Sequence, residues 1–559
     1  MDALPKDILQ IYAHSFRDNW DLPALTDYGS TDVISYGEMA RRIAMMHLLY
    51  RQLGIKRGDK IALMGRNTSG WVVVFMATVT YGAVIVPVLQ DFNPHDAQHI
   101  LHHSDARLLF VSTHIWEHME AESLPKIEAV FSLDSTTILA DRGGRGARAL
   151  SQLGSKFKSE YRSGYSRESV SYPQLPADSV AVINYTSGTT GFSKGVMLTL
   201  DNLNGNVTFG IESKLLSQGS RILSFLPLAH AYGCAFDMLT ALAVGAHVTL
   251  LGKLPTPKLL LKAMHEVKPS LVLCVPLILE KIYKKQIVPM LSKRAVRMAM
   301  SIPFVDKALY SRIRAKLIDA FGGEFESVIV GGAPLNSDVE KFLYRIGFPF
   351  TVGYGMTECG PLISYTPWRE FCDGSSGRTL PCMEAKIVRP VDADALAPSA
   401  SDVGEICVRG QNVMKGYYKN QEATEAVIDK DGWLHTGDMG TVAADGTLYI
   451  RGRYKTMILT STGQNIYPEE IEAKLNNMAY VAECLIVDRN GHLTALIYPD
   501  YDAMDAENLV SYQLDDVMKA NIAELNKLVA PYEKVEGFKL VPHEFEKTPK
   551  RSIKRFLYS

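Results

Sequence analysis

Hydrophobic and polar positions in the first 173 residues alternate between helical and strand-like spacing. The spacing predicts a helix that Ser35 opens and that runs through Leu53, followed by a buried strand over 60–64. Further elements are predicted as a helix and then a strand over 71–87, a helix over 96–103 and a strand over 107–111. This alternation is typical of a parallel sheet that is covered by helices.

The stretch from Trp71 to Leu89 is uncharged and long enough to span a bilayer. Gly82 and Pro87 interrupt it, and its second half is rich in β-branched residues. We therefore expect a helix and then a strand of an α/β core. The N-terminus lacks the charged and apolar regions of a secretory signal.

Composition changes between Asp141 and Pro176, where Gly, Ser, Arg and Tyr become frequent. The segment begins with an arginine–glycine patch over 142–146, a feature that some RNA-binding segments share. One short patch is weak support for such a role. We expect a solvated connecting loop here.

Later strands are predicted over 326–330 and 350–352, and each ends in glycine and small polar residues. Open α/β sheets bind ligands at the carboxyl ends of their strands. Gly353 and Gly355 do not fit G-x-G-x-x-G, so the pattern does not indicate a dinucleotide site.

From Gly404 the pattern changes to short strands, over 404–410, 433–440 and 446–450, which predict a small β-subdomain. A helix that begins at Pro468 opens a compact α+β tail reaching Ser559.

The long apolar stretch 223–251 contains His230 and Tyr232 near its start. A lone histidine beside apolar residues is more often a satisfied core residue. The prolines and glycines around His230 instead suggest the mouth of an apolar pocket, so both interpretations stay open.

Length and charge narrow the class of protein. A chain of 559 residues is long enough for three or four domains or subdomains. Lys and Arg number 59 against 61 Asp and Glu, which argues against a nucleic-acid binder or a polybasic membrane anchor and favours small-molecule partners. Seven cysteines without a C-x-x-C pair predict reduced thiols in a cytoplasmic protein and no metal cluster.

The segment from Tyr185 to Gly195 combines hydroxyl side chains, three glycines and Lys194. It lies between predicted strands over 180–184 and 196–199, whereas a Walker loop must open a helix. Glycines let backbone amides converge on an anion, and hydroxyls and a lysine add donors and charge. We predict a phosphate-binding loop between two strands.

Several separate stretches together resemble the acyl-adenylating superfamily of acyl-CoA synthetases, luciferases and nonribosomal adenylation domains. They are the phosphate loop from Thr186 to Gly195, Gly332-Ala333-Pro334, the G-Y-G-x-T-E motif from Gly353 to Glu358, Thr436-Gly437-Asp438, and Gly452-Arg453-Tyr454-Lys455. Their joint occurrence in this order is specific, and the resemblance covers essentially the whole chain.

The resemblance implies a role for each motif. Phosphate contacts are expected from Thr186, Ser187, Gly188, Thr189, Thr190, Gly191 and Lys194, and adenine contacts from Gly332, Ala333, Pro334, Tyr354 and Gly355. Thr357 and Arg453 would contact the α-phosphate and ribose, Asp438 the ribose hydroxyls, and Glu358 a Mg²⁺ ion.

The implied reaction has two halves. A carboxylate attacks the α-phosphorus of ATP and releases pyrophosphate, and the thiol of coenzyme A then displaces AMP from the acyl-adenylate. The implied fold is α/β, with a large N-terminal domain over 1–451 and a mobile α+β lid over 452–559 that swivels about Lys455. Within the large domain we expect two doubly wound sheets, at about 1–178 and 179–350, and a β-rich subdomain over 351–451.

The sequence departs from the family motif near its C-terminus, where Ser552 occupies the usual position of a catalytic lysine. Serine is neutral and short, so either Lys550 or Lys554 reaches the site or adenylation is weak. We hypothesise that one of these two lysines compensates. Thr456 also replaces the usual aspartate after the hinge.

Segments 226–230 and 275–283 look most like those of bacterial-type fatty acyl-CoA synthetases for medium or long chains. Two alternatives stay open: a ligase that loads an acyl carrier protein, and a nucleotide-binding protein that has lost catalysis. Peripheral contact with a membrane also stays open for a fatty-acid substrate.

Overall fold

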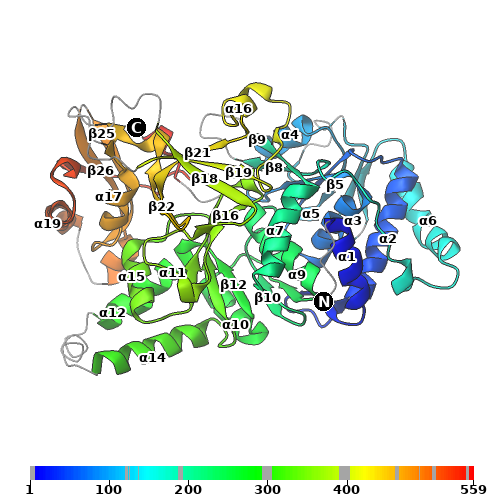
Figure 1. Cartoon of the computed structure of the whole chain (residues 1–559), viewed down its shortest axis with the longest axis horizontal. Coiled ribbons are helices and arrows are strands. Elements are labelled where there is room, and N and C mark those ends of the chain that lie inside the picture. Colours follow the sequence, from blue (N-terminus) through cyan, green and yellow to red (C-terminus); the bar gives the residue numbers. More distant parts are fainter. Residues whose placement is uncertain are drawn as a thin grey trace.

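A computed structural model of the chain places its described residues in three consecutive parts (Figure 1). The described residues are 7–119, 124, 126–135, 137–186, 193–291, 305–389, 403–459, 465–489, 491–506, 511–548 and 553–558. An N-terminal α/β part leads into a β-rich centre and then into a C-terminal part drawn in orange and red. The predicted α/β fold class is confirmed.

The largest sheet has eight strands in the order β20-β9-β8-β4-β3-β5-β6-β7. In this order their bounds are Gly416–Tyr417, Lys194–Thr199, Val180–Thr186, Val84–Val88, Lys60–Met64, Ala106–Val111, Ala129–Ser132 and Ile138–Asp141. The strands from β8 to β6 run parallel, and β9 and β7 pair antiparallel with their neighbours. Every residue of β4 is buried, which explains its uninterrupted apolar sequence.

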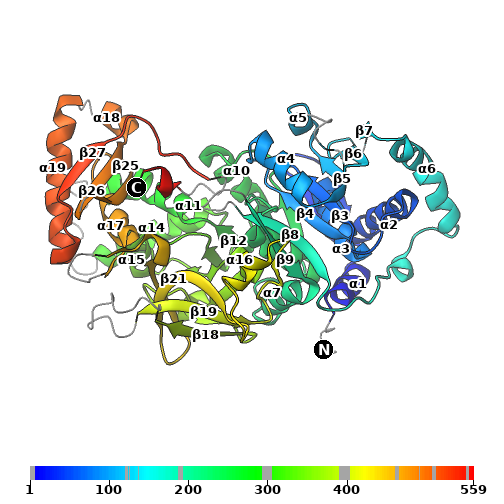
Figure 2. The same cartoon turned by 90° about the horizontal axis from the view of Figure 1, so that it is seen from above.

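Helices lie on both sides of this sheet (Figure 2). Those of the N-terminal part are α1 (Ile8–Asp18), α2 (Tyr36–Leu53), α3 (Ser69–Tyr81), α4 (Pro94–His103), α5 (Thr113–Trp116), α6 (Arg145–Glu160) and α7 (Leu200–Glu212). The apolar stretch over 71–89 forms α3 and then β4, as predicted. Gly82 ends α3 in the left-handed conformation with φ of 88°. Among the described residues, no helix is both long and apolar enough to cross a membrane.

A second α/β layer contains two neighbouring sheets of mostly parallel strands. One has the order β10 (Arg221–Ser224), β11 (His247–Leu250), β1 (Pro23–Asp27) and β2 (Val33–Ser35); the other has β12 (Leu271–Cys274), β13 (Ser327–Val330) and β14 (Phe350–Val352). The N–H of Ser270 donates to the carbonyl of Arg221 over 2.7 Å and joins the two sheets. Because β1 pairs with β11, this layer takes strands from both sides of residue 178.

Helices of the second layer connect and flank its strands. They are α8 (Ala231–Gly233), η3 (Cys234–Leu239), α9 (Thr240–Val244), α10 (Pro257–Val267), α11 (Pro276–Ile282), η4 (Tyr283–Ile287), α12 (Val288–Leu291), α14 (Val305–Ala320) and α15 (Ser337–Arg345).

The β-rich centre contains a three-stranded and a four-stranded sheet. They comprise β15 (Tyr354–Gly355), β16 (Leu362–Tyr365) and β17 (Arg378–Thr379), and β18 (Met383–Val388), β19 (Gly404–Gly410), β21 (Leu434–Val442) and β22 (Leu448–Arg453). Short helical turns here are η5 (Thr357–Cys359), η6 (Trp368–Glu370) and α16 (Gln421–Glu425). The strands predicted from residue 404 onward are confirmed.

The C-terminal part has its own hydrophobic core, built from residues between Ile466 and Val535. Its elements are η8 (Tyr454–Thr456), β23 (Ile458–Leu459), β24 (Asn465–Ile466), α17 (Pro468–Leu475), β25 (Val481–Arg489), β26 (His492–Pro499), α18 (Tyr501–Ala506), α19 (Ser511–Leu528), η9 (Pro531–Glu533), β27 (Gly537–Leu540) and η10 (Arg555–Leu557). The larger core extends from Ile8 to Leu448. The proposed boundary after residue 451 falls within β22, between these cores, and stays a prediction.

The expectation of a connecting loop over 141–176 is wrong for residues 145–160, which form α6. Ala149, Leu153 and Phe157 are buried at helical spacing, and α6 packs against α2. The stripe is narrow, and the glycine, serine and arginine around it give the segment the composition of a loop.

Substitutions at two glycines of this segment test whether residues 145–160 form a helix. Gly154 lies exposed inside α6 and a Cβ added there would meet no neighbouring atom, so Gly154→Ala should favour the helix by about 1 kcal/mol. Hydrogen exchange of the α6 amides should slow by about fivefold. Gly144 is equally open but caps the helix with φ of 68°, so Gly144→Ala should speed exchange in the first turn. Unchanged or faster exchange in Gly154→Ala would contradict the helix.

Candidate functional site

The predicted phosphate loop connects two antiparallel strands, β8 and β9, which confirms the strand–loop–strand reading. Thr186 ends β8 and pairs with Lys194, which begins β9. The five residues Ser187, Gly188, Thr189, Thr190 and Gly191 lie outside the described residues. The hairpin therefore fixes both ends of the loop and places Lys194 at its exit.

Tyr417 contacts both Lys194 and Glu358. The Lys194 Nζ lies 4.8 Å from the centre of the Tyr417 ring, and the Tyr417 hydroxyl donates to Glu358 Oε1 over 2.9 Å. Burial, together with the nearby Glu358 carboxylate, raises the Tyr417 pKa well above its usual range, so the hydroxyl keeps its proton and remains a donor. Tyr417 thus holds a lysine and a carboxylate near one end of the phosphate loop.

Strand β20 positions Tyr417 because it pairs with β9, opposite Val196. Sequence analysis missed this residue. It lies in a segment of two tyrosines, Tyr417 and Tyr418, that matched none of the motifs, and its partners lie 59 or more residues away. Only the pairing of strands from distant parts of the chain identifies it.

Hydrogen bonds to backbone atoms hold the turn that carries Thr357 and Glu358. Met414 N–H donates to the Glu358 carbonyl over 2.8 Å, and Asn206 Oδ1 accepts from Leu362 N–H over 3.0 Å. Thr357 is buried, and Gly355 approaches the Pro361 carbonyl so closely that an added Cβ would collide with it. A glycine in the G-Y-G-x-T-E motif is therefore required by packing.

Tyr354, Asp438 and Arg453 form a connected polar group. The Tyr354 hydroxyl donates to Asp438 Oδ2 over 2.7 Å, and Arg453 Nε lies 2.8 Å from Asp438 Oδ1. Asp438 and Arg453 are opposite each other in the β21–β22 pairing. Strand pairing therefore fixes this contact independently of any ligand.

Burial differs sharply within this group. The Asp438 side chain is 7% exposed and that of Arg453 is 59% exposed. Burial raises the Asp438 pKa, and the Arg453 guanidinium opposes the rise. Each oxygen of Asp438 has a donor, as a buried carboxylate requires. A ligand hydroxyl would replace or share the donors that these oxygens now have.

The stretch Gly332-Ala333-Pro334 follows β13 and lies beside the G-Y-G-x-T-E motif. Gly353 N–H donates to the Val330 carbonyl over 2.9 Å, which joins the ends of β14 and β13. Gly332 adopts a φ of 87°, and residues 332–334 are exposed. The structure thus brings the two predicted adenine-contact segments together at the carboxyl ends of parallel strands.

Tyr232 packs beneath this loop. Its hydroxyl donates to the Ile329 carbonyl over 3.0 Å, and a Cβ added at Gly331 would lie 3.2 Å from the Tyr232 ring. His230 precedes α8 and is half-buried. Both candidate pocket residues therefore lie on the segment leading from β10 toward the adenine-contact loop.

Asp237 lies deeper on the same segment, in η3, and is 1% exposed. Burial raises its pKa far above the usual range, and a hydrogen bond with Ser224 opposes this only in part. A buried acidic residue therefore lies on the same segment as His230 and Tyr232, and burial disfavours its charged form.

The C-terminal candidates are placed separately. Lys550 and Ser552 lie outside the described residues. Lys554 Nζ lies 3.3 Å from Glu546 Oε2, and within the described part of the chain no contact joins it to Lys194, Glu358 or Asp438. The structure therefore does not bring Lys554 to the other candidates.

Lys455 is exposed in the turn η8, next to Thr456. Thr456 is the residue that replaces the usual aspartate. Its hydroxyl donates to Glu469 Oε1 over 2.6 Å and so connects the predicted hinge to the first turn of α17.

Known proteins are similar to this chain over most of its length. Residues 12–418 match the family model described as AMP-binding enzyme. The chain is 28% identical to the long-chain-fatty-acid–CoA ligase FadD15 of Mycobacterium bovis, over 94% of this chain and 90% of the relative. It is 30% identical to the peroxisomal long chain acyl-CoA synthetase 7 of Arabidopsis thaliana, over 94% and 80% respectively.

The fold is also similar to that of solved structures. ATP-bound MatB from Rhodopseudomonas palustris superposes with a TM-score of 0.75 at 23% identity, with 98% of each chain covered. At this identity the likeness concerns the fold alone.

Removal of the Tyr354 hydroxyl tests whether it stabilises the buried Asp438 carboxylate. Tyr354→Phe removes the donor to Oδ2 and leaves a buried carboxylate oxygen without it, which should cost about 1–3 kcal/mol. We expect at least fivefold faster hydrogen exchange in β21.

Tyr344→Phe is the matched control because Tyr344 is 52% exposed. It should change exchange little, since surface substitutions usually alter stability by less than about 0.5 kcal/mol. Equal exchange in the two variants would show that the Tyr354 hydroxyl does not support Asp438.

Proposed function

This chain belongs to the AMP-binding enzyme family, and from that membership we propose that it activates a long-chain fatty acid with ATP and transfers the acyl group to coenzyme A. The product of the first step is an acyl-adenylate, and AMP leaves in the second step. The long-chain substrate is inferred from relatives that are named as long-chain ligases.

The observation that carries the proposal is the convergence of Lys194 and Glu358 on Tyr417 beside the β8–β9 loop. A cation and a carboxylate at the mouth of a glycine-rich loop suit a nucleoside triphosphate bound with a metal ion. Lys194 would neutralise phosphate charge as pyrophosphate leaves.

Glu358 fits a Mg²⁺ ligand because its carboxylate is a hard oxygen donor of which only Oε1 is engaged by Tyr417. Mg²⁺, when bound there, would offset negative charge on the phosphate oxygens. Tyr417 orients the Glu358 carboxylate through its hydroxyl. Thr357, buried in the same turn, would be the neighbouring contact for the α-phosphate.

Asp438 and Arg453 would hold the ribose. The Asp438 oxygens can accept from the two ribose hydroxyls, while the exposed Arg453 side chain is free to turn from the carboxylate toward the α-phosphate. Tyr354 and residues 332–334 would line the adenine site. Catalysis then consists of positioning and charge stabilisation, without a covalent enzyme intermediate.

The acyl chain would occupy the apolar interior around His230 and Tyr232. Burial disfavours the charged form of Asp237 on the same segment. Each buried methylene contributes about 0.8 kcal/mol, so the depth of the interior would select chain length. The lid about Lys455 would move between the two half-reactions and admit the thiol.

The deciding experiment incubates the purified chain with ATP, Mg²⁺ and saturated fatty acids of increasing length. We expect AMP and acyl-CoA to form with coenzyme A, and an acyl-adenylate without it. Glu358→Gln should lower adenylate formation by on the order of 10²–10³-fold, whereas Glu422→Gln, which alters an exposed carboxylate on α16, should not.

Two other results would redirect the proposal. Transfer to an acyl carrier protein but not to coenzyme A would identify the alternative ligase. Failure to form an adenylate with any fatty acid would favour a nucleotide-binding protein without this activity.

The missing lysine gives a separate prediction. If Lys550 or Lys554 compensates for Ser552, then Lys550→Ala or Lys554→Ala should lower fatty-acid-dependent exchange of pyrophosphate into ATP by at least tenfold. Lys539→Ala, at an exposed lysine of β27, serves as the control. Unchanged exchange in both test variants would refute compensation.

A further inference from the structure

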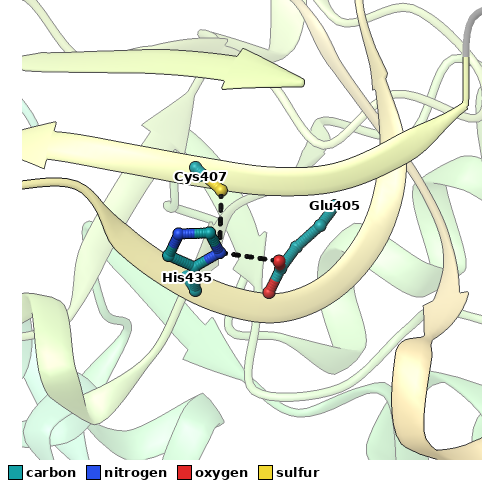
Figure 3. A group of neighbouring side chains, drawn as sticks. All are labelled: Glu405, Cys407 and His435. Atoms are coloured by element: carbon teal, nitrogen blue, oxygen red, sulfur yellow. Dashed lines mark hydrogen bonds and ion pairs between the residues drawn. The ribbon is translucent and has the colours of Figure 1, made fainter. Parts of the chain in front are cut away.

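Glu405, Cys407 and His435 come together across the strands β19 and β21 (Figure 3). Cys407 and His435 are direct partners in the strand register, although they are 28 residues apart in sequence. Glu405 is on the same strand and face as Cys407, two residues earlier. Their potential ligand atoms all lie within 4.8 Å of one another.

Two of the distances between the ligand atoms are close to those in a tetrahedral zinc site. His435 Nδ1 lies 3.4 Å from Cys407 Sγ and 2.8 Å from Glu405 Oε2. Zinc bond lengths place neighbouring ligand atoms about 3.4–3.6 Å apart in a tetrahedron. The nitrogen–sulfur distance already matches, and the nitrogen–oxygen distance needs an opening of about half an ångström.

Exposure provides a route for an ion. The side chains of His435 and Glu405 are 33% and 18% exposed, while Cys407 is buried. Water could therefore complete the coordination from the exposed side. Lys386 pairs with Cys407 across the sheet, and its Nζ lies 4.0 Å from the centre of the Trp433 ring.

We propose that Glu405, Cys407 and His435 bind a thiophilic divalent cation of the zinc class, at a site separate from the Mg²⁺ position at Glu358. Thiolate and imidazole ligands select such ions, whereas Mg²⁺ prefers oxygen ligands. On binding, the Cys407 proton passes to solvent and a metal–sulfur bond forms.

The absence of a C-x-x-C pair predicts no metal cluster. Cysteine spacing along the chain does not reflect ligands that strand pairing brings together. Here the ligands are one cysteine, one histidine and one carboxylate, and the pairing of two strands brings them together.

The site is connected to the proposed ribose contact. Glu405 Oε1 accepts from Gly437 N–H over 3.0 Å, and Gly437 immediately precedes Asp438. A cation bound at Glu405 Oε2 would move this carboxylate by about half an ångström, the distance needed to separate Oε2 from His435 Nδ1. We therefore expect the cation to change ATP affinity, an effect that rests on the proposed role of Asp438.

The test is Co²⁺ titration of the metal-free full-length chain, without nucleotide, in a Cys372→Ser background that removes the exposed thiol. We expect saturable binding of one equivalent with a cobalt–thiolate absorption band in the near ultraviolet. Competition with Zn²⁺ should remove the band. Because no substrate is present, this result does not depend on the proposed enzymatic activity.

Variants identify the ligands. Cys407→Ser should abolish the thiolate band, and Glu405→Gln should weaken binding at least tenfold while its amide oxygen still accepts from Gly437. His492→Gln is the control, because His492 pairs with the Glu536 carboxylate and tests whether a histidine–carboxylate pair alone binds the cation. Thermal unfolding of each variant verifies that it is folded.

Two outcomes would overturn the site: no saturable Co²⁺ binding by the folded parent protein, or an unchanged band in Cys407→Ser. ATP affinity that is equal with and without Zn²⁺ would overturn the coupling to Asp438. A shift in ATP affinity that disappears in Cys407→Ser would support it.

Discussion

The pairing of β20 with β9 is the constraint on which the proposed nucleotide site depends. It attaches the β-rich centre to the edge of the eight-stranded sheet and places Tyr417 where one side chain meets both Lys194 and Glu358. These two charged residues come from segments more than 160 positions apart in sequence. The strand pairing, together with the hydrogen bond from Leu362 N–H to Asn206 Oδ1, fixes the G-Y-G-x-T-E turn relative to the loop exit.

The same fold stabilises the buried carboxylate of Asp438 with two side-chain donors. Taking a carboxylate out of water is unfavourable, and its raised pKa reflects this. The Tyr354 hydroxyl and the Arg453 guanidinium offset that cost from opposite oxygens. Because Arg453 is largely exposed, its pairing in water is weak and can be exchanged for a ligand contact, whereas the buried Tyr354 contact remains.

The sequence predicts the parts of this fold that depend on local pattern. Alternating segments predict the parallel strands, and spaced motifs predict the phosphate loop and the turn around Glu358. What it misses depends on contacts between distant residues or on a weak pattern. Tyr417 becomes a site residue only through β20, and Cys407 and His435 become neighbours only through strand register. The α6 stripe is periodic, but glycine, serine and arginine are frequent among its apolar residues.

The C-terminal tail limits how a substitute lysine can reach the nucleotide. Lys554 pairs with Glu546 near the surface, and an exposed pair of this kind contributes at most about 1 kcal/mol. The next residue, Arg555, pairs with Glu472, whose burial raises its pKa to about 7 while Arg555 opposes the rise. Breaking that buried pair would be far more costly than releasing Lys554. Lys554 would therefore approach the nucleotide by movement of the C-terminal part as a body, with Arg555 still bound to α17, and not by a local shift of the tail.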